Sequence, residues 1–320
     1  MQTFTNNLIF SLNATIPIFL MMALGFFLQR IHLLDDHTTQ KLNQFAFKVL
    51  LPALLFMDLS TADFQSVWDT KFVLFCFCIT SVSIGIAFLL SLLHRERADR
   101  GEFIQASYRS SAALLGIAFI QNIYGTAQMA PLMIIGSVPL YNIFAVIILT
   151  LESNSAQKQD TTLRIKTACI GILKNPIIIG IFLGLVASFF NFSLPHMLDK
   201  TIQNLSVMAS PLALISIGAS FEGKKAIAKI KPTLAASFIK LAGLAAIFLP
   251  IAIYLGFRDQ KLIAIIIMLA SPCTPTSYIM AKNLDNDATL ASSIVVMTTL
   301  LSSLTLTGWI FLTRLMQLIQ

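Results

Sequence analysis

Charged residues are scarce in this chain, and their scarcity excludes a soluble globular domain. Only 12% of the 320 residues are Asp, Glu, Lys or Arg, whereas 56% are hydrophobic. A soluble domain carries about twice that share of charge, because its surface must stay hydrated. The composition therefore indicates an integral membrane protein.

Cysteine and histidine are also few, with four of each. The cysteines lie in or beside apolar segments, without the partners that a zinc site requires. The histidines lie in connections and join no Ser/Asp arrangement suited to nucleophilic catalysis. We therefore expect no metal, no cofactor and no enzymatic activity. The residues concerned are Cys76, Cys78, Cys169, Cys273, His32, His37, His94 and His196.

The sequence contains several long runs without a charged residue. Each is about as long as a helix that crosses the hydrocarbon core, which needs roughly 20 residues. The run 110–151 is long enough for two helices, and two further spans tolerate one lysine each. We therefore predict an all-α membrane protein with ten transmembrane helices, the first of them retained. The uncharged runs are 8–29, 72–93, 110–151, 175–195, 201–221, 262–281 and 288–313, and the lysine-containing spans are 38–58 and 232–255.

The 22 basic residues are distributed unevenly between the two sides of the membrane. Seventeen of them fall in or beside the odd-numbered connections. The excess of positive charge on cytoplasmic loops places these connections in the cytoplasm, and both termini outside the cytoplasmic membrane. Because the charges are scattered over short connections, nucleic acid is not expected as a partner. Three basic residues within spans, Lys48, Arg109 and Lys240, are expected to extend to the lipid headgroups.

The two halves of the chain resemble each other at an offset of 159 residues. The segments "KLNQFAFKVLLPALLFMDLS" and "KTIQNLSVMASPLALISIGA" share lysine, glutamine and proline at equal spacing, and the later spans correspond at the same shift. Five spans in each half would make the second copy inverted in the membrane. We therefore predict a first repeat over 1–151, a cytoplasmic linker over 152–169 and a second repeat over 170–320. The identical pairs are Lys41/Lys200, Gln44/Gln203 and Pro52/Pro211.

The segment "ASPCTPTSYIMAK" at 270–282 is predicted to break the ninth span. Pro272 and Pro275 lack a backbone donor, so carbonyls near residues 268 and 271 lose their partners. The hydroxyls of Thr274, Thr276 and Ser277 can replace the missing hydrogen bonds. A broken helix also presents an N-terminus with partial positive charge, which suits an anion. A merely kinked packing helix is the alternative.

The first repeat weakens the corresponding span. Shifting Pro275 back by 159 reaches Gly116, within "RSSAALLGIAFIQNIYG". Gln121 and Asn122 follow, and amides in an apolar helix are expected to face protein or a cavity. A hydrogen bond between helices is an equally good interpretation of them. Asn142 in the fifth span either lines the same cavity or caps a neighbouring broken end.

Several segments together resemble the auxin efflux carrier family, which includes bacterial permeases for malate and other organic acids. They are "KLNQFAFKVLLPALLF", "RSSAALLG", "VPLYNIFAVI", "KNPIIIGIFLG", "SPLALISIGAS" and "SPCTPTSYIMAKNLDND" followed by "ASSIVVMTTLLSS". The resemblance implies two inverted five-helix repeats with broken, crossing fourth and ninth helices. Helices 1, 2, 6 and 7 would form a scaffold, and helices 3–5 and 8–10 a transport domain that moves like an elevator.

The chain departs from the family pattern in the fourth span. In plant members a carboxylate substrate meets an asparagine five residues before a conserved glycine. Here the glycine is matched by Gly116 and the asparagine position by Ser111, which keeps a donor but lacks the amide's reach. A family proline is replaced by Ala118, so the fourth helix need not break. The short linker resembles the bacterial branch.

We therefore expect a secondary transporter for a small organic anion, a carboxylate such as malate. Because no Asp or Glu lies at a predicted midplane position, we favour movement driven by the membrane potential, or by sodium held by carbonyls and hydroxyls, over a proton relay. A cation antiporter of similar fold and an anion channel are the alternatives, and a homodimer stays open. The expected substrate-binding residues are Ser111, Gly116, Asn122, Asn142, Thr274, Thr276 and Ser277, with Gln121, Asp58 and Arg109 as candidates for ion binding or gating.

Overall fold

The structure is a computed structural model. It describes residues 16–17, 19–60, 68–93, 96–112, 120, 123–124, 129–153, 170, 173–190, 192, 194–221 and 223–319. Every secondary-structure element in these ranges is a helix, so the predicted all-α class is confirmed for the described part of the chain.

Six of the described helices are long and apolar enough to cross a membrane. Two shorter apolar helices, Phe19–Arg30 and α9 (Pro176–Phe189), lie at the predicted first and sixth spans. These helices agree with a multi-pass membrane protein, while the count of ten spans stays a prediction. The six are α2 with η1 and α3 (Asp36–Ser60), α4 (Thr70–Ser91), α7 (Met129–Leu151), α10 (His196–Ala219), α12 with η4 and α13 (Ile230–Tyr254) and α16 (Thr289–Leu315).

Shorter elements complete the described part. Two long spans contain one π-helical turn each, η1 (Ala46–Leu50) between α2 (Asp36–Phe45) and α3 (Leu51–Ser60), and η4 (Ile239–Gly243) between α12 (Ile230–Phe238) and α13 (Leu244–Tyr254). The remaining elements are η2 (Arg97–Asp99), α5 (Arg100–Tyr108), α11 (Gly223–Ala228), α14 (Asp259–Ala270) and α15 (Thr276–Asn283).

Local sequence explains where the apolar helices begin. The Asn175 side chain accepts a hydrogen bond from the Ile177 backbone N–H at 2.9 Å, and Pro176 occupies the first turn, where its missing N–H costs nothing. The Asp69 carboxylate caps α4 in the same way, accepting from the Phe72 N–H at 3.0 Å. Both caps satisfy donors that an apolar helix could not satisfy in lipid.

Helix bounds recur at the offset of 159 residues found in the sequence. Span Asp36–Ser60 shifts to 195–219 and meets α10, which begins at His196 and ends at Ala219. The other described spans behave alike. Phe19–Arg30 shifts to 178–189 and meets α9, α4 shifts to 229–250 and meets Ile230–Tyr254, α5 shifts to 259–267 and meets α14, and α7 shifts to 288–310 and meets α16.

Close helix contacts repeat with the same offset. A Cβ atom on Gly25 would lie 2.1 Å from the Ile215 carbonyl oxygen, and one on Gly184 would lie 2.9 Å from that of Phe56. Adding 159 to 25 and 56 gives 184 and 215, so the two contacts are equivalent. The repeat therefore extends from sequence spacing to helix packing, while its inverted orientation in the membrane stays a prediction.

We expect Gly25→Ala to destabilise the protein, because its Cβ would overlap the backbone of α10 and force the helices apart. Overpacking of this kind costs about 1–3 kcal/mol. Gly85→Ala in α4 is the matched control, since no atom lies within 4 Å of its added Cβ. The measurement is the melting temperature in detergent. A Gly25→Ala variant as stable as Gly85→Ala would contradict the packing.

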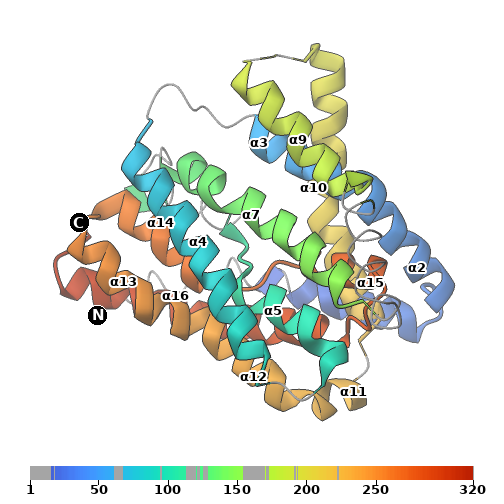
Figure 1. Cartoon of the computed structure of the whole chain (residues 1–320). Coiled ribbons are helices and arrows are strands. Elements are labelled where there is room, and N and C mark those ends of the chain that lie inside the picture. The colour runs from blue at the N-terminus through green and yellow to red at the C-terminus, as the bar shows by residue number, and fades with distance from the viewer. Residues whose placement is uncertain are drawn as a thin grey trace.

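The helices pack in two groups that meet at the breaks. α3 packs mainly against α9 and α10, which lie at the upper right of Figure 1. α4, α5, α7, α12, α13, α14 and α16 pack mainly among themselves. α15 contacts α2 and α10 on one side and α5, α7 and α16 on the other. The segment that leads into α15 therefore lies where the two groups meet.

Candidate functional site

The ninth predicted span is interrupted in its middle. α14 ends at Ala270 and α15 begins at Thr276, so the five residues Ser271–Pro275 are non-helical. Pro272 and Pro275 lie in this segment, and Ser271 has extended backbone with φ −73° and ψ 159°. The interruption exposes the last carbonyls of α14 and the first N–H groups of α15 to side chains from other helices.

Lys240 satisfies the carbonyls at the end of α14. Its Nζ atom donates to the carbonyl oxygens of Met268 at 3.2 Å and Leu269 at 2.8 Å. The expectation that Lys240 reaches the lipid headgroups is wrong, because its side chain is fully buried. The C-terminal end of a helix carries partial negative charge, so an ammonium group is a suitable partner there. Tyr141 also donates to the Met268 carbonyl, at 3.2 Å.

The chain is also non-helical where the fourth predicted span begins. α5 ends at Tyr108, and Arg109 has extended backbone with ψ 135°. Arg109 to Ser111 are non-helical. The span thus begins at Arg100, ten residues before the uncharged run that predicted it. Gly116, Gln121 and Asn122, together with Ala118, lie outside the described residues.

The two interrupted segments touch each other. The Ser111 N–H donates to the Pro272 carbonyl oxygen at 3.0 Å. The hydroxyls of Ser110 and Ser271 share a hydrogen bond, and the Ser110 hydroxyl also lies 3.2 Å from the Ile267 carbonyl. Each break therefore supplies hydrogen bonds that the other lacks.

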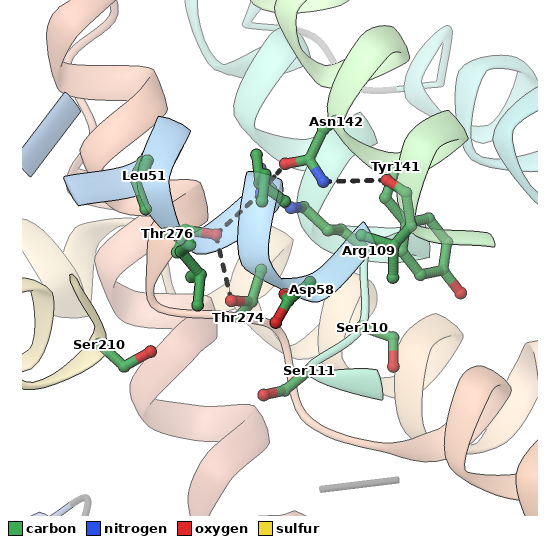
Figure 2. A pocket seen from close by; sticks show the side chains of 13 residues that line it. Leu51, Asp58, Arg109, Ser110, Ser111, Tyr141, Asn142, Ser210, Thr274 and Thr276 are labelled. Atoms are coloured by element: carbon green, nitrogen blue, oxygen red, sulfur yellow. Dashed lines mark hydrogen bonds between the residues drawn. The ribbon is translucent and has the colours of Figure 1, made fainter. Parts of the chain in front are cut away.

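A cavity of about 50 Å³ lies beside this crossing (Figure 2). It is much smaller than the roughly 300–1,000 Å³ of a pocket for a drug-sized ligand, so in this conformation it fits only a small ion or a compact ligand. Its walls come from α3, α10, α7 and the two breaks. The lining residues are Leu51, Leu54, Leu55, Asp58, Arg109, Ser110, Ser111, Val138, Tyr141, Asn142, Ser210, Thr274 and Thr276.

Arg109 brings a positive charge to the cavity wall. Its guanidinium donates to the Asn142 Oδ1 atom at 2.5 Å and the Thr276 Oγ1 atom at 2.8 Å, and it contacts the Met280 Sδ atom. The expectation that Arg109 extends to the headgroups is wrong, because the residue is only 3% exposed. Among the described residues its acceptors are all neutral, and no carboxylate forms an ion pair with it.

Neighbouring hydrogen bonds hold these acceptors in place. The Asn142 Nδ2 atom donates to the Val138 carbonyl at 2.9 Å, which directs Oδ1 toward Arg109. The Thr274 and Thr276 hydroxyls lie 3.1 Å apart. The Ser277 hydroxyl donates to the Thr274 carbonyl at 2.7 Å and does not line the cavity. Ser277 therefore supports the backbone of the interrupted segment, at a carbonyl other than those expected, and its role in substrate binding stays a prediction.

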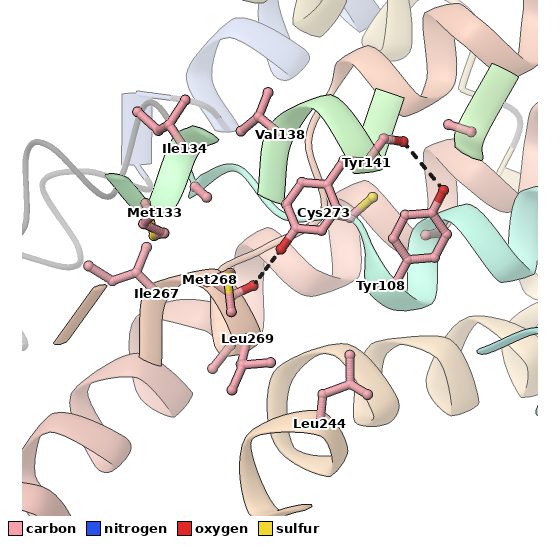
Figure 3. Close-up of a cluster of buried hydrophobic side chains, with 14 of the residues drawn as sticks. Tyr108, Met133, Ile134, Val138, Tyr141, Leu244, Ile267, Met268, Leu269 and Cys273 are labelled. Atoms are coloured by element: carbon pink, nitrogen blue, oxygen red, sulfur yellow. Dashed lines mark hydrogen bonds between the residues drawn. The ribbon is translucent and has the colours of Figure 1, made fainter. Parts of the chain in front are cut away.

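An apolar cluster lies behind the cavity (Figure 3). Tyr108 and Tyr141 stack at a tilt with ring centroids 6.0 Å apart, and the Tyr108 hydroxyl donates to the Tyr141 carbonyl at 3.4 Å. Met133 and Leu244 pack in the same cluster, and both are buried. These side chains exclude water from one side of the crossing, which strengthens the electrostatic interactions of the site.

Glu102 is a buried acid that the sequence did not single out. Its carboxylate accepts hydrogen bonds from the N–H groups of Ala288 at 2.7 Å and Ala291 at 2.8 Å, and so caps the start of α16. Gln105, one turn later, donates to the Ser277 carbonyl at 3.0 Å. Both residues belong to α5, whose polar composition is typical of a connection. A helix whose polar side chains are satisfied inside the protein gives no hydropathy signal.

An ion-pair cluster joins the ends of α5, α12 and α16. The Lys229 ammonium lies 2.8 Å from Asp99 and 3.0 Å from Asp287. Burial favours a higher pKa for Asp287, but hydrogen bonds from Lys229 and Thr289 outweigh burial and lower the pKa below its usual value. Asp287 thus stays ionised at neutral pH, and the ion pairs tie these helix ends together.

The whole chain matches a known protein family. A family model described as "Membrane transport protein" covers residues 10–310. The chain belongs to this family. It is the auxin efflux carrier family that the motifs predicted, so the chain is a membrane transporter.

Two relatives of this transporter match over almost their full lengths. A protein of Rhizobium meliloti (strain 1021), named "Putative malonate transporter", is 25% identical over 310 residues, which cover 93% of this chain and 94% of the relative. An "Uncharacterized transporter" of Methanothermobacter thermautotrophicus is 21% identical over 308 residues, covering 93% and 97%. Both names agree with transport, and the similarity covers most of the length of all three chains.

Proposed function

We propose that this transporter is a secondary carrier that moves a small organic anion, a carboxylate such as malate, across the cytoplasmic membrane. The anion binds in the cavity at the crossing of the two interrupted spans. Arg109 is its charged partner, and the side chains of Ser111, Asn142, Thr274 and Thr276 supply neutral hydrogen bonds.

The burial of Arg109 is the observation that carries this proposal. A buried cation is costly unless an opposite charge compensates it. In the described part of the chain Arg109 contacts only amide, hydroxyl and thioether acceptors, yet it lines a cavity. A carboxylate matches the planar donor pattern of a guanidinium and would compensate its charge. The site is therefore suited to an anionic ligand.

Arg109 argues against a cation antiporter, and the size of the cavity argues against a channel. A cation antiporter would have to admit a positive ion beside a guanidinium in a site of low dielectric constant, where like charges repel strongly. A channel requires a continuous pore, whereas the cavity measures about 50 Å³. A carrier that binds its ligand in a small site fits both facts.

Two further observations support an elevator mechanism, and a third supports a carboxylate substrate. The packing of α3, α9 and α10 apart from the other helices agrees with a division into a scaffold and a transport domain. The cavity has walls from both groups, since Leu51 and Ser210 belong to one and Asn142 to the other. A relative is named for malonate, a small dicarboxylate.

We expect malate or malonate to raise the melting temperature of the purified protein, because a ligand of the native state stabilises it. At about 100 times Kd the gain is about 2.7 kcal/mol. The measurement is a thermal-shift titration with sodium or potassium as the cation, against chloride at equal ionic strength. A shift with cation or pH but with none of the carboxylates would contradict the proposal in favour of an ion antiporter.

A further inference from the structure

Two charged side chains of opposite sign line the central cavity. Of the described lining residues only Asp58 and Arg109 carry a full charge. Asp58 belongs to α3, whereas Arg109 follows α5 at the interrupted fourth span. Figure 2 draws both side chains on the walls of this one cavity. The charges therefore come from the two different helix groups.

The Asp58 carboxylate has no partner of its own among the described residues, with neither a hydrogen bond nor an ion pair. Asp58 was expected as a candidate for ion binding or gating. It lies two residues before the end of α3 and lines the same small cavity as Arg109. An unpaired carboxylate at a low-dielectric site is either compensated by a nearby cation or takes up a proton.

Among the described residues, the helices packed against α3 bring no other charge to the cavity. α3 packs against α9, α10, η1 and α7. α9 has no titratable side chain, and α10 has none over 201–219. η1 contains only Lys48, which is exposed, and α7 contributes the hydroxyl of Tyr141, which donates to a backbone carbonyl. Arg109 is thus the group with which Asp58 shares its electrostatic environment.

We propose that Asp58 binds the proton that accompanies each anion, so that the carrier is a proton–anion symporter. This inference rests on the proposed function. In the empty site the ionised Asp58 adds a negative charge to the cavity without forming an ion pair with Arg109. When an anion binds Arg109, a second negative charge enters the same small cavity, and the Asp58 carboxylate oxygen takes a proton from the same aqueous side. Anion and proton are released together on the opposite side.

The cavity suits a proton better than a sodium ion in this role. A hard metal cation needs a shell of oxygen ligands. Here the hydroxyls at the cavity already have hydrogen-bond partners. Ser110 bonds to the Ser271 hydroxyl, Thr274 bonds to Thr276, and Thr276 also accepts from Arg109. A proton needs only the carboxylate oxygen of Asp58. Neutralising Asp58 also removes the repulsion between two negative groups in one small site.

The test is the pH dependence of malonate binding, measured by calorimetry on the purified full-length protein. For the wild type we expect Kd to rise about tenfold per pH unit above the pKa of the empty site, because binding then requires proton uptake. Titrations in two buffers of different ionisation enthalpy give the number of protons taken up for each malonate bound. After correction for the protonation of malonate itself, we expect this number to be one.

Asp58→Asn isolates the residue, because asparagine imitates the protonated carboxyl group. We expect this variant to bind malonate with the low-pH affinity of the wild type at every pH, apart from the ionisation of malonate itself. In proteoliposomes it should exchange malonate but lose accumulation driven by a pH gradient. Asp36→Asn, at an exposed carboxylate, is the matched control and should keep the wild-type pH dependence.

The outcomes separate this inference from the proposed function. Malonate binding that depends on Arg109 but takes up no extra proton would overturn the role of Asp58 and leave the carrier standing. A sodium requirement that Asp58→Asn abolishes would assign Asp58 to a cation and overturn the proton. The proton count uses the wild-type protein, so a variant that fails to fold does not prevent the test. Failure of malonate and malate to bind at all contradicts the proposed function instead.

Discussion

Arg109→Gln is expected to abolish uptake of malate and malonate into proteoliposomes. Glutamine keeps a hydrogen-bond donor on a shorter side chain but removes the only positive charge among the described residues of the cavity wall. Losing one member of a buried charge pair costs about 2–5 kcal/mol, which corresponds to a loss of affinity of about 30-fold to several thousandfold. The measurement is saturation uptake of radiolabelled substrate, together with the ligand-induced thermal shift.

Stability provides the internal control for this variant. Removing a buried cation that has only neutral partners should leave the melting temperature of the empty protein unchanged or raise it, because the desolvation cost of the guanidinium disappears. Arg30→Gln is the matched control, since Arg30 is exposed and lies over the Phe26 ring at 5.1 Å. Uptake by Arg109→Gln at the Arg30→Gln level would refute the anion site.

The fourth span shows how far a sequence can predict this site. Its uncharged run begins at Ser110, so Arg109 read as the boundary of a span, suited to the headgroup region. The structure begins the span at Arg100, because Glu102 caps α16 and Gln105 holds α15, and neither residue meets lipid. Hydropathy measures contact with lipid and not satisfaction by protein, so a polar helix inside the protein reads as a connection.

The second interruption was predictable because its cause is local. Two prolines three residues apart remove backbone donors whatever surrounds them, and the non-helical segment Ser271–Pro275 follows from that. The helix bounds were predictable from hydrophobic length and from the repeat. The partners of the freed carbonyls were not, because Lys240 and Tyr141 lie 28 and 127 residues from Met268 in the chain. Side-chain pairing over such separations has no signature in a single sequence.

Lys240→Met is expected to lower the melting temperature markedly. Methionine fills similar space but leaves the carbonyls of Met268 and Leu269 without their ammonium donor. Tyr141 still donates to Met268, so the Leu269 carbonyl suffers most. An unsatisfied buried acceptor costs about 1–3 kcal/mol, and the partial negative charge at the end of α14 loses its compensation as well. The measurement is thermal unfolding in detergent, with malonate added in a second series.

Lys48→Met is the control that shows whether the loss of stability in Lys240→Met comes from the carbonyls at the end of α14. Each of these lysines lies within a largely apolar span, so hydropathy treats them alike, yet Lys48 is exposed and Lys240 is fully buried. Substitution of an exposed residue usually changes stability by less than about 0.5 kcal/mol. Equal effects of the two variants would mean that both lysines act through the membrane interface. A large effect confined to Lys240 would mean that the carrier keeps its broken helix with a buried ammonium group, and that the interruption is maintained by the second repeat rather than by proline alone.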